Sequence, residues 1–281
     1  MSEDKILHGK HSPLRVITCI KQVPGTTQVE IDEETGNLKR DGVESKMNMY
    51  DLFSIEAALS LTGEYGGNVR VLTMGPPQAE SVLWEAIYMG ADTGILISDR
   101  RFAGSDVLAT AYTLSQAVTS LGDYDLILCG KQTTDGDTAQ VGSELAELLD
   151  IPHASGIASV EPDGAGGVTV RLNRDDRIVT QRMPLPCLLC MDGDINTPRL
   201  PSFKRKKTLA NEKLQLLTLD DLVDKDESHY GLTGSPTQVE AIFPPEKGSG
   251  HELFTGTGDE LGKKLAEILI SKKMVVSEGV S

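Results

Sequence analysis

The chain has 281 residues, of which 39% are hydrophobic and 25% are charged, a composition typical of a folded protein with a sizeable core. Its formal net charge of −15 argues against nucleic acid or an anionic membrane as the main partner. No run approaches the roughly 20 apolar residues needed to cross a bilayer, and the N-terminal residues 1–15 lack the apolar core of a signal peptide. We therefore expect a cytoplasmic protein.

The cysteines and histidines give little sign of a metal or nucleophile site. Four cysteines are too few for a disulfide framework in a chain of this length, and they fit a reducing compartment. Cys187 and Cys190 form a single CxxC inside an apolar run, which we interpret as buried strand residues rather than zinc or redox ligands. The histidines have no metal-ligand spacing, and no Ser/His/Asp, Cys/His or HExxH pattern stands out. If the protein does redox work, a bound cofactor must supply the reactive atoms.

Strand and helix patterns alternate over the first 150 residues. Such alternation predicts βαβ units and a doubly wound, mostly parallel sheet. Asp51 is expected to cap the first helix, Pro77 to lie in the first turn of the second, and Ser105 or Asp106 to cap the third. The acidic segment 32–42 is expected to form a surface hairpin. The predicted strands span residues 15–20, 69–73, 94–98 and 126–129.

The later chain changes character. Short strand patterns over 155–161, 167–172, 178–183 and 186–191 predict an antiparallel extension and one further central strand. From residue 196 the chain becomes basic and is expected to be extended; its Lys/Arg run at 204–207 is either a solvated surface or a site for phosphate or an acidic partner.

We expect little core in residues 220–250 and interpret them as an arm that lies on something else. Residues 259–274 have an amphipathic helical pattern, with an apolar stripe that needs a partner on this chain or on another subunit. These patterns divide the chain into an α/β domain over 14–195 and a C-terminal arm with a terminal helix over 196–281.

The junction after strand 126–129 is the most informative stretch. The strand stops at Gly130 and a helical pattern begins near Thr138, so backbone amides and a helix N-terminus gather there, an arrangement that suits phosphate. Thr138 can cap the helix or donate to a phosphate oxygen. The spacing is neither GxGxxG nor GxxxxGK[ST], and Asp135 and Asp137 would repel a phosphate unless they face away. A nucleotide site and an ordinary strand–helix junction both remain open on these grounds.

The run QTTDGDTAQVG at 132–142, followed by LAELLDIP, resembles the signature of the electron-transfer flavoprotein β subunit. The likeness continues in VITCIKQVPGT, NMYDLFSIEAAL, VRVLTMGPPQAE and NTPRLPS, from about residue 14 to about residue 245. It implies an adenine nucleotide α-hydrolase-like fold and a flavin-carrying α subunit as partner. In one branch of this family the β subunit binds only AMP. In the electron-bifurcating branch it binds a second FAD, which takes a hydride from NADH and divides the two electrons between acceptors of low and high potential.

The resemblance also implies nucleotide contacts at the strand ends and in the main loop, most of them through backbone amides. The implied cofactor-binding residues are Cys19, Lys21, Val23, Asp51, Thr73, Gly75, Gly130, Gln132, Thr134, Asp135, Gly136, Asp137, Thr138, Gln140, Val141 and Gly142.

The segment SDRRFAGSDVLATA at 98–111 resembles the form found in bifurcating members, where it helps to place NAD near the flavin. Gly104 and Ser105 at a helix N-terminus can receive the NAD pyrophosphate, and Arg100 or Arg101 can add positive charge. The alternative is a capped helix followed by small packing residues. The NAD-binding residues implied by the resemblance are Arg100, Gly104, Ser105, Asp106 and Thr110.

The expected partners follow from the same resemblance. They are the α subunit, a flavin dehydrogenase of the lactate or acyl-CoA type, and ferredoxin or flavodoxin as low-potential acceptor. The chain lacks the longer partner-gripping segment that many members have after Arg199, and GLTGSPTQVEAIFPP at 231–245 resembles β subunits that accompany a lactate dehydrogenase. The alternatives are a non-bifurcating β subunit that binds AMP, and a stand-alone nucleotide-binding module.

Overall fold

The computed structural model describes residues 13–25, 45–136, 138–209, 213–238 and 252–275. The chain forms two compact units, residues 1–240 and 241–281, which are described separately. The hairpin expected over 32–42, the residues 239–251 of the expected arm and Asp137 lie outside the described residues. The division into a domain over 14–195 and an arm over 196–281 stays a prediction.

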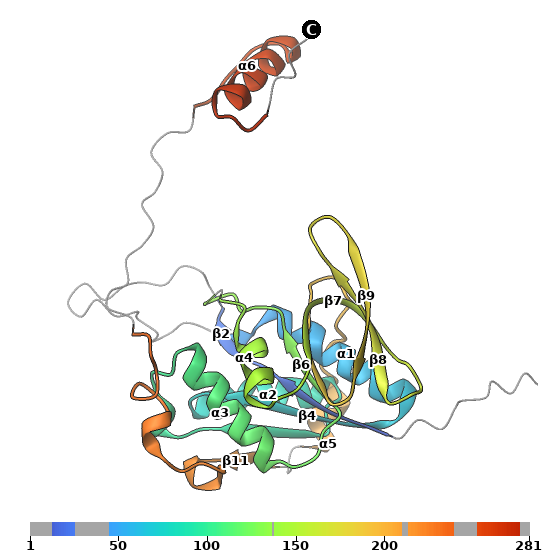
Figure 1. Cartoon of the computed structure of the whole chain (residues 1–281), viewed down its shortest axis with the longest axis vertical. Helices are drawn as coiled ribbons and strands as arrows, with labels where there is room; N and C mark the ends of the chain where they lie inside the picture. The colour runs from blue at the N-terminus through green and yellow to red at the C-terminus, as the bar shows by residue number, and fades with distance from the viewer. Residues whose placement is uncertain (1–12, 26–44, 137, 210–212, 239–251, 276–281) are drawn as a thin grey trace, which may run out of the picture. The chain divides into compact units, whose positions relative to one another are not determined.

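A nine-stranded sheet forms the centre of the first unit, in the order β11-β5-β4-β1-β6-β10-β7-β8-β9 (Figure 1). The strands from β11 to β7 pair in parallel, whereas β7, β8 and β9 pair antiparallel. A mostly parallel sheet with a small antiparallel extension was predicted, and the structure confirms it. The strands are β1 (Leu14–Cys19), β4 (Gly67–Met74), β5 (Thr93–Ile97), β6 (Leu126–Gly130), β7 (His153–Pro162), β8 (Gly167–Asn173), β9 (Ile178–Pro184), β10 (Cys187–Met191) and β11 (Gln215–Leu217), with β2 (Gln22–Pro24) and β3 (Ser45–Met47) paired separately.

Helices cover both faces of this sheet because successive residues of its buried strands point to opposite sides. In β1, Val16 joins one core with residues of α1 and α2, and Ile17 joins the other with residues of α3 and α4. The helices of the first unit are α1 (Met49–Tyr65), α2 (Glu80–Met89), α3 (Val107–Ser120), α4 (Val141–Leu148) and α5 (Phe203–Thr208), with short 3₁₀ turns η1 (Pro77–Ala79), η2 (Arg100–Phe102), η3 (Leu219–Asp221) and η4 (Glu227–His229).

The strand order places the ligand-binding edge. The chain passes from β1 to β4 on one side of β1 and later to β6 on its other side, so the sheet reverses its winding between β1 and β6. In open parallel sheets the crevice at the carboxyl ends of such strands is where ligands bind.

Two helix starts differ from the expectations. Asp51 does not cap α1: Asn48 precedes the helix, and Asp51 lies buried in its first turn. Helix α4 begins at Val141, so Thr138 does not cap it. Ala139 has a positive φ of 55°, which interrupts the helical conformation just before α4. Pro77 lies in the 3₁₀ turn that leads into α2, as expected for a proline at a helix start.

The segment after residue 196 is extended only as far as Ser202. Arg199 donates to the carboxylate of Glu56 in α1. Its backbone amide lies at 3.0 Å, and its Nε and a terminal nitrogen lie at 2.8 Å each. These bonds hold this stretch against the first helix. The Ser202 hydroxyl then accepts a hydrogen bond from the Arg205 amide and caps the N-terminus of α5. The expected extended form was therefore wrong for 203–208, because a capping serine precedes the basic run.

The expectation of little core over 220–250 was also wrong for its described part, residues 220–238. Residues 213–238, which we call the strap, add strand β11 to the edge of the sheet, a strand that the sequence pattern did not predict. Leu222 and Tyr230 are buried in the same core as α3. The strap therefore lies on this chain.

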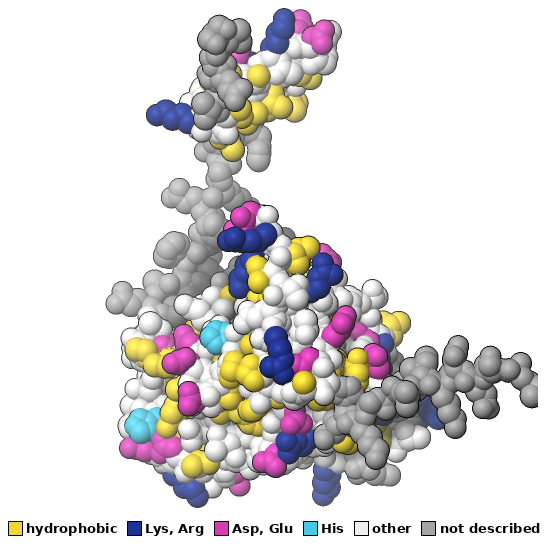
Figure 2. All heavy atoms as spheres, turned by 45° about the vertical axis from the view of Figure 1, so that its right-hand side comes forward, with side chains coloured by type: hydrophobic (Ala, Val, Ile, Leu, Met, Phe, Trp, Pro, Cys, Tyr) yellow, Lys and Arg dark blue, Asp and Glu magenta, His cyan; other side chains and the backbone are white. Residues whose placement is uncertain are grey.

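The second unit contains α6 (Gly258–Ser271), which confirms the helix predicted over 259–274. Thr257 and Glu260 form a capping box at its start. None of its described residues is buried, and Figure 2 shows hydrophobic side chains gathered on one side of this helix. The partner expected for this stripe stays a prediction.

Candidate functional site

A cleft of about 890 Å³ opens at the carboxyl ends of β1, β4, β5 and β6, where the sheet topology favours a ligand. Its walls come from the loops after these strands and from the N-termini of α3 and α4. Most of the residues singled out in the sequence line it: Cys19, Lys21, Asp51, Gly75, Gly130, Gln132, Gly136, Thr138, Gln140, Val141 and Gly142, together with Arg100, Gly104, Ser105, Asp106 and Thr110.

Four other predicted residues within the described ranges do not line the cleft. Val23 and Thr73 are buried, Thr134 is exposed, and Asp135 forms an ion pair with Lys21, whose Nζ lies 2.7 Å from the Asp135 carboxylate. Because Lys21 balances this carboxylate, Asp135 adds less negative charge to the loop than the sequence suggested. Their contacts with a ligand stay predictions.

Asp51 ties the ends of β1 and β6 together. Its carboxylate accepts the Lys21 amide at 2.7 Å, and the Gly130 amide also donates to it. Burial raises the pKa of Asp51 to about 7, although these donors oppose the shift. A Cβ on Gly130 would overlap this carboxylate and come within 2.8 Å of the Tyr50 backbone. Gly130 is thus required by the packing of α1 against β6, whatever its role toward a ligand.

Asn48 extends the same clamp, and the sequence reasoning missed it. This residue is buried, and its Nδ2 donates to Asp51 at 3.0 Å and to the carbonyl of Gln132 at 2.9 Å. Asn48 therefore fixes the loop after β6 to the start of α1. The sequence did contain a signal for this role. Asparagine is a preferred residue directly before a helix, and Asn48 precedes the first residue of α1.

The first turn of α4 packs closely on the sheet. A Cβ on Gly142 would lie 2.5 Å from the Cys190 sulfur, closer than packed atoms approach. Thr133 donates its hydroxyl to the Gly136 carbonyl at 2.9 Å, and the Thr138 amide donates to the same carbonyl at 2.9 Å. These contacts give the segment 130–142 a compact shape along one wall of the cleft.

Three thiols lie in register across neighbouring strands beneath this wall. Cys19 of β1 pairs with Cys129 of β6, which pairs with Cys190 of β10. Cys19 is partly exposed to the cleft, whereas the other two are buried. A hydrogen bond with Cys19, together with burial, raises the pKa of Cys129 well above its usual value. Cys187 and Cys190 are both buried in β10, which confirms the interpretation of the CxxC.

The wall formed by residues 98–110 offers a second set of ligand-binding groups. Asp106 caps α3 by accepting the Ala109 amide at 3.0 Å, one of the two caps expected. Gly104 has a positive φ of 78°. Among the described residues, no hydrogen bond is formed by the amides of Gly104 or Ser105. These amides, beside the N-terminus of a 14-residue helix, suit a phosphate group.

The two adjacent arginines have different roles. Arg101 binds Asp99 through Nε at 3.0 Å and a terminal nitrogen at 2.6 Å, and these bonds lower the pKa of Asp99 to about 2. Arg101 also reaches Glu227 at 3.3 Å. Arg100 is exposed and lines the cleft. Arg100 is therefore better placed than Arg101 to add positive charge for a ligand.

The cleft fits an adenine dinucleotide by size and chemistry. Its volume lies within the usual range for cofactor sites, roughly 300 to 1,000 Å³, and two helix N-termini supply amides for phosphates. Glycines at 130 and 142 let this segment pack closely on the protein, because a Cβ would meet Asp51 at the first position and the Cys190 sulfur at the second. No group of three His, Cys, Asp or Glu residues suited to a metal ion occurs in the described ranges.

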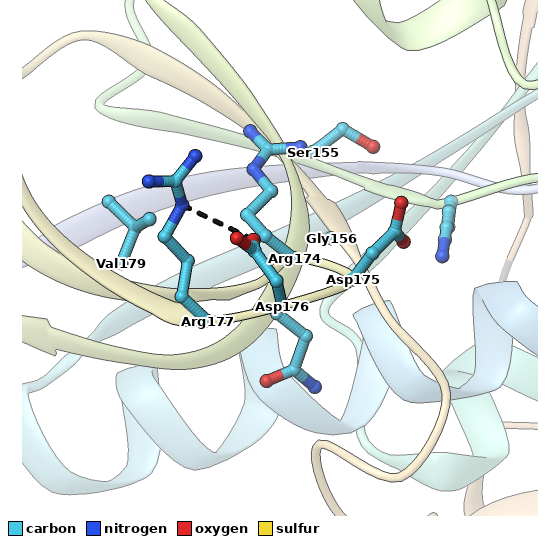
Figure 3. A pocket seen from close by; sticks show the side chains of 9 residues that line it. Ser155, Gly156, Arg174, Asp175, Asp176, Arg177 and Val179 are labelled. Atoms are coloured by element: carbon cyan, nitrogen blue, oxygen red, sulfur yellow. Dashed lines mark ion pairs between the residues drawn. The ribbon is translucent and has the colours of Figure 1, made fainter. Parts of the chain in front are cut away.

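A second hollow of about 560 Å³ lies at the turn between β8 and β9. Figure 3 shows Arg177 directed at Asp176, and their ion pair measures 3.4 Å with both side chains largely exposed. Because cationic and acidic side chains of an exposed turn line this hollow together, it lacks the one-signed charge of a phosphate site. Lys131 contacts both the hollow and the cleft.

Comparison with known proteins gives a consistent result. Residues 35–218, more than half of the chain, match the family model described as the electron transfer flavoprotein domain. The electron transfer flavoprotein subunit beta of Thermoanaerobacterium thermosaccharolyticum is 42% identical over 93% of this chain and 100% of its own length. The chain belongs to the electron transfer flavoprotein β-subunit family.

Two further relatives show the breadth of this family. A subunit of the caffeyl-CoA reductase-Etf complex of Acetobacterium woodii, CarD, is 38% identical over 93% of this chain and 100% of its own length. Protein FixA of Azorhizobium caulinodans is 40% identical over 83% of this chain and 85% of its own length. Membership makes electron transfer, within a flavoprotein, the function of this β subunit. No described helix has both the length and the apolar character required to cross a membrane.

Proposed function

We propose that this chain is the NAD-linked β subunit of a bifurcating, heterodimeric electron transfer flavoprotein, with FAD and NAD(H) both bound in the cleft. Electrons would be divided between ferredoxin or flavodoxin and a flavin dehydrogenase of the lactate or acyl-CoA type. The observation that supports the proposal is that one cleft is lined by two separate segments whose groups suit a phosphate, 130–142 and 98–110. One nucleotide requires only one such segment, whereas a flavin and a nicotinamide dinucleotide require two.

Bound flavin supplies the hydride and electron chemistry, and the residues of the chain bind and orient the reactants. The amides and glycines of 130–142 bind the flavin's adenine nucleotide, with Asp51 and Asn48 holding this segment in place. The amides of Gly104 and Ser105, with the Arg100 guanidinium, bind the pyrophosphate of NAD(H).

The named partners rest on different supports. The α subunit follows from membership of a family of two-subunit flavoproteins, and the terminal helix α6 offers an apolar stripe for it. A dehydrogenase partner is supported by the relative CarD, which is named as part of a caffeyl-CoA reductase complex. Ferredoxin or flavodoxin, the lactate dehydrogenase and a cytoplasmic location rest on the sequence alone.

The second candidate is a non-bifurcating β subunit that binds AMP and supports electron transfer by an α-subunit FAD. The single set of groups at 130–142 would satisfy AMP, and the free amides at 104–105 would then have no ligand. These amides favour the NAD-linked form.

Flavin content decides between the two. The chain should be co-purified with its α subunit and titrated with NADH in the absence of oxygen. About two FAD per heterodimer, with one reduced directly by NADH, is the result expected for the proposed function. One FAD plus AMP, with no reduction by NADH, would contradict it.

A further inference from the structure

The strap, residues 213–238, is anchored on α3 and on Phe102 of η2. Tyr230 is buried, and its ring lies 5.5 Å from that of Phe102 and 5.4 Å from that of Tyr112. The Tyr112 hydroxyl donates to the Asp224 carboxylate at 2.6 Å, and the Tyr230 hydroxyl donates to the Asp224 carbonyl at 2.6 Å. These contacts fix the strap in place, and the residues that follow Tyr230 can therefore hold the neighbouring segment 99–106.

Residues 232–237 of the strap form hydrogen bonds with Ala103 and Asp106 of the segment 99–106. The Leu232 amide donates to the Ala103 carbonyl at 3.0 Å, and the Asp106 amide donates to the Ser235 hydroxyl at 2.8 Å. Thr237 donates to the Asp106 carboxylate through its amide at 3.0 Å and its hydroxyl at 2.7 Å. Asp106 therefore has partners for its amide and for both carboxylate oxygens.

The approach of the two segments is close. Gly231 has a positive φ of 58°, and a Cβ there would overlap the Arg101 carbonyl oxygen. Ser235 is buried, and its hydroxyl donates to the Gly231 carbonyl at 2.7 Å while it accepts from Asp106. Such closely packed, fully hydrogen-bonded contacts fix a loop in one conformation.

We infer that Ser235 and Thr237 are positioning residues for the pyrophosphate of NAD(H), an inference that rests on the proposed function. By engaging the amide and the carboxylate of Asp106, they leave the amides of Gly104 and Ser105 as the groups available to the ligand. They also hold a carboxylate that would otherwise be free to turn toward an anionic ligand. Asp106 then supports the site without contacting the nucleotide.

The test uses the heterodimer with Ser235→Ala, and with the matched pair Thr237→Val and Thr237→Ser. Ser235→Ala leaves the Asp106 amide without a buried acceptor, and we expect about ten-fold weaker NAD⁺ binding by calorimetry. Thr237→Val, at an exposed site, should weaken binding by about three-fold, while Thr237→Ser keeps the hydroxyl and should bind as the wild type. Ser228→Ala is the control, because Ser228 is an exposed strap residue whose hydroxyl donates to Asp226.

Amide hydrogen exchange supplies a readout that does not depend on activity. Ser235→Ala should exchange faster at the Asp106 amide, which loses its acceptor, with unchanged FAD content. If the wild-type heterodimer binds no NAD⁺, the proposed function fails, and this inference with it. If the wild type binds and Ser235→Ala binds equally well with unchanged exchange, the inference alone is wrong. If Ser235→Ala loses FAD or unfolds, the Thr237 pair decides: equal affinities of Val and Ser variants overturn the inference.

Discussion

The two walls of the cleft are held in different ways. Segment 130–142 is fixed by Asn48 and Asp51, buried residues at the start of α1 that also fix the ends of two central strands. Segment 99–106 is fixed by the strap, which packs against the sheet edge and α3 more than 100 residues later in the chain. Asn48 and Asp51 are buried between central strands, whereas the strap holds segment 99–106 through residues near its own end, so damage to the first support should affect the whole fold. Damage to the second should affect only the ligand at that wall.

The largest effect is expected from Asp51→Ala. The variant removes a buried carboxylate that accepts from the amides of Lys21 and Gly130, so we expect a loss of about 3 kcal/mol in the free energy of unfolding. Flavin retention should fall with it. Urea denaturation and flavin content of the purified heterodimer measure both. Asp176→Ala, at a largely exposed ion pair, should change neither measurably. A stable, flavin-replete Asp51→Ala protein would show that the first wall does not depend on the clamp.

Gly104→Val should break the second wall alone. Valine is strained at a positive φ of 78°, and its Cβ would lie 3.2 Å from the Leu232 Cβ. We expect NADH to reduce the flavin with about ten-fold weaker apparent binding, while FAD stays bound. Rapid-mixing kinetics at increasing NADH concentration separate the binding constant from the limiting rate. Gly122→Val, also at a positive φ but with no neighbour near its Cβ, is the matched control. Equal NADH kinetics in all three proteins would remove the role given to this loop.

The pH dependence of stability sharpens the comparison. The pKa of Asp51 is raised to about 7 in the folded protein, so the folded state holds its proton over a range where the unfolded state, with a pKa near 3.9, has lost it. The free energy of unfolding should therefore fall as the pH rises from about 4 to 7, by at most about 1.4 kcal/mol per pH unit from this group.

Asp51→Asn removes this ionisation. The difference in unfolding free energy between wild type and variant should consequently change across pH 4 to 7, and it should be constant if Asp51 titrates normally. No such slope is expected for Asp106→Asn between pH 5 and 7, because backbone and Thr237 hydrogen bonds outweigh burial and lower the pKa of Asp106.

The difference between the walls also explains what the sequence could predict. Periodicity identified the central strands and helices α1 to α3, since each buries a regular apolar face. It placed the start of α4 too early because Ala139 adopts a left-handed conformation that alanine rarely signals. The family resemblance indicated the cleft residues, most of which the structure brings together.

What the sequence could not predict are supports that depend on long-range contacts. Ser235 looks like an ordinary loop serine in the sequence, and its role follows from its burial and its bond to Asp106. Strand β11 spans Gln215–Leu217, too short to show a period, and it is stabilised by pairing with β5. Asn48 was passed over because a carboxylate nearby offered a plausible helix cap.

The smallest effect is expected in the alkylation of the thiols beneath the first wall. Comparing the alkylation rates with and without FAD tests whether the bound nucleotide covers the end of β1. Cys19 is the partly exposed thiol, whereas burial raises the pKa of Cys187 and of Cys190 to about 12 in each case. An alkylating reagent should thus label Cys19 first, because thiolates react and buried thiols resist. FAD at ten times its Kd should slow this labelling about ten-fold, since it leaves about a tenth of the sites free.

Peptide mapping by mass spectrometry measures the labelling at each cysteine. Cys187, whose side chain lies in the core on the opposite face of the sheet, serves as an internal control and should stay unlabelled in native protein with or without nucleotide. Cys19→Ala should abolish the rapid labelling and leave FAD binding nearly unchanged, because the resemblance implies that most of the nucleotide contacts are made through backbone amides. Equal labelling of Cys19 with and without FAD would place the flavin's nucleotide away from β1, and the first wall would then need another ligand.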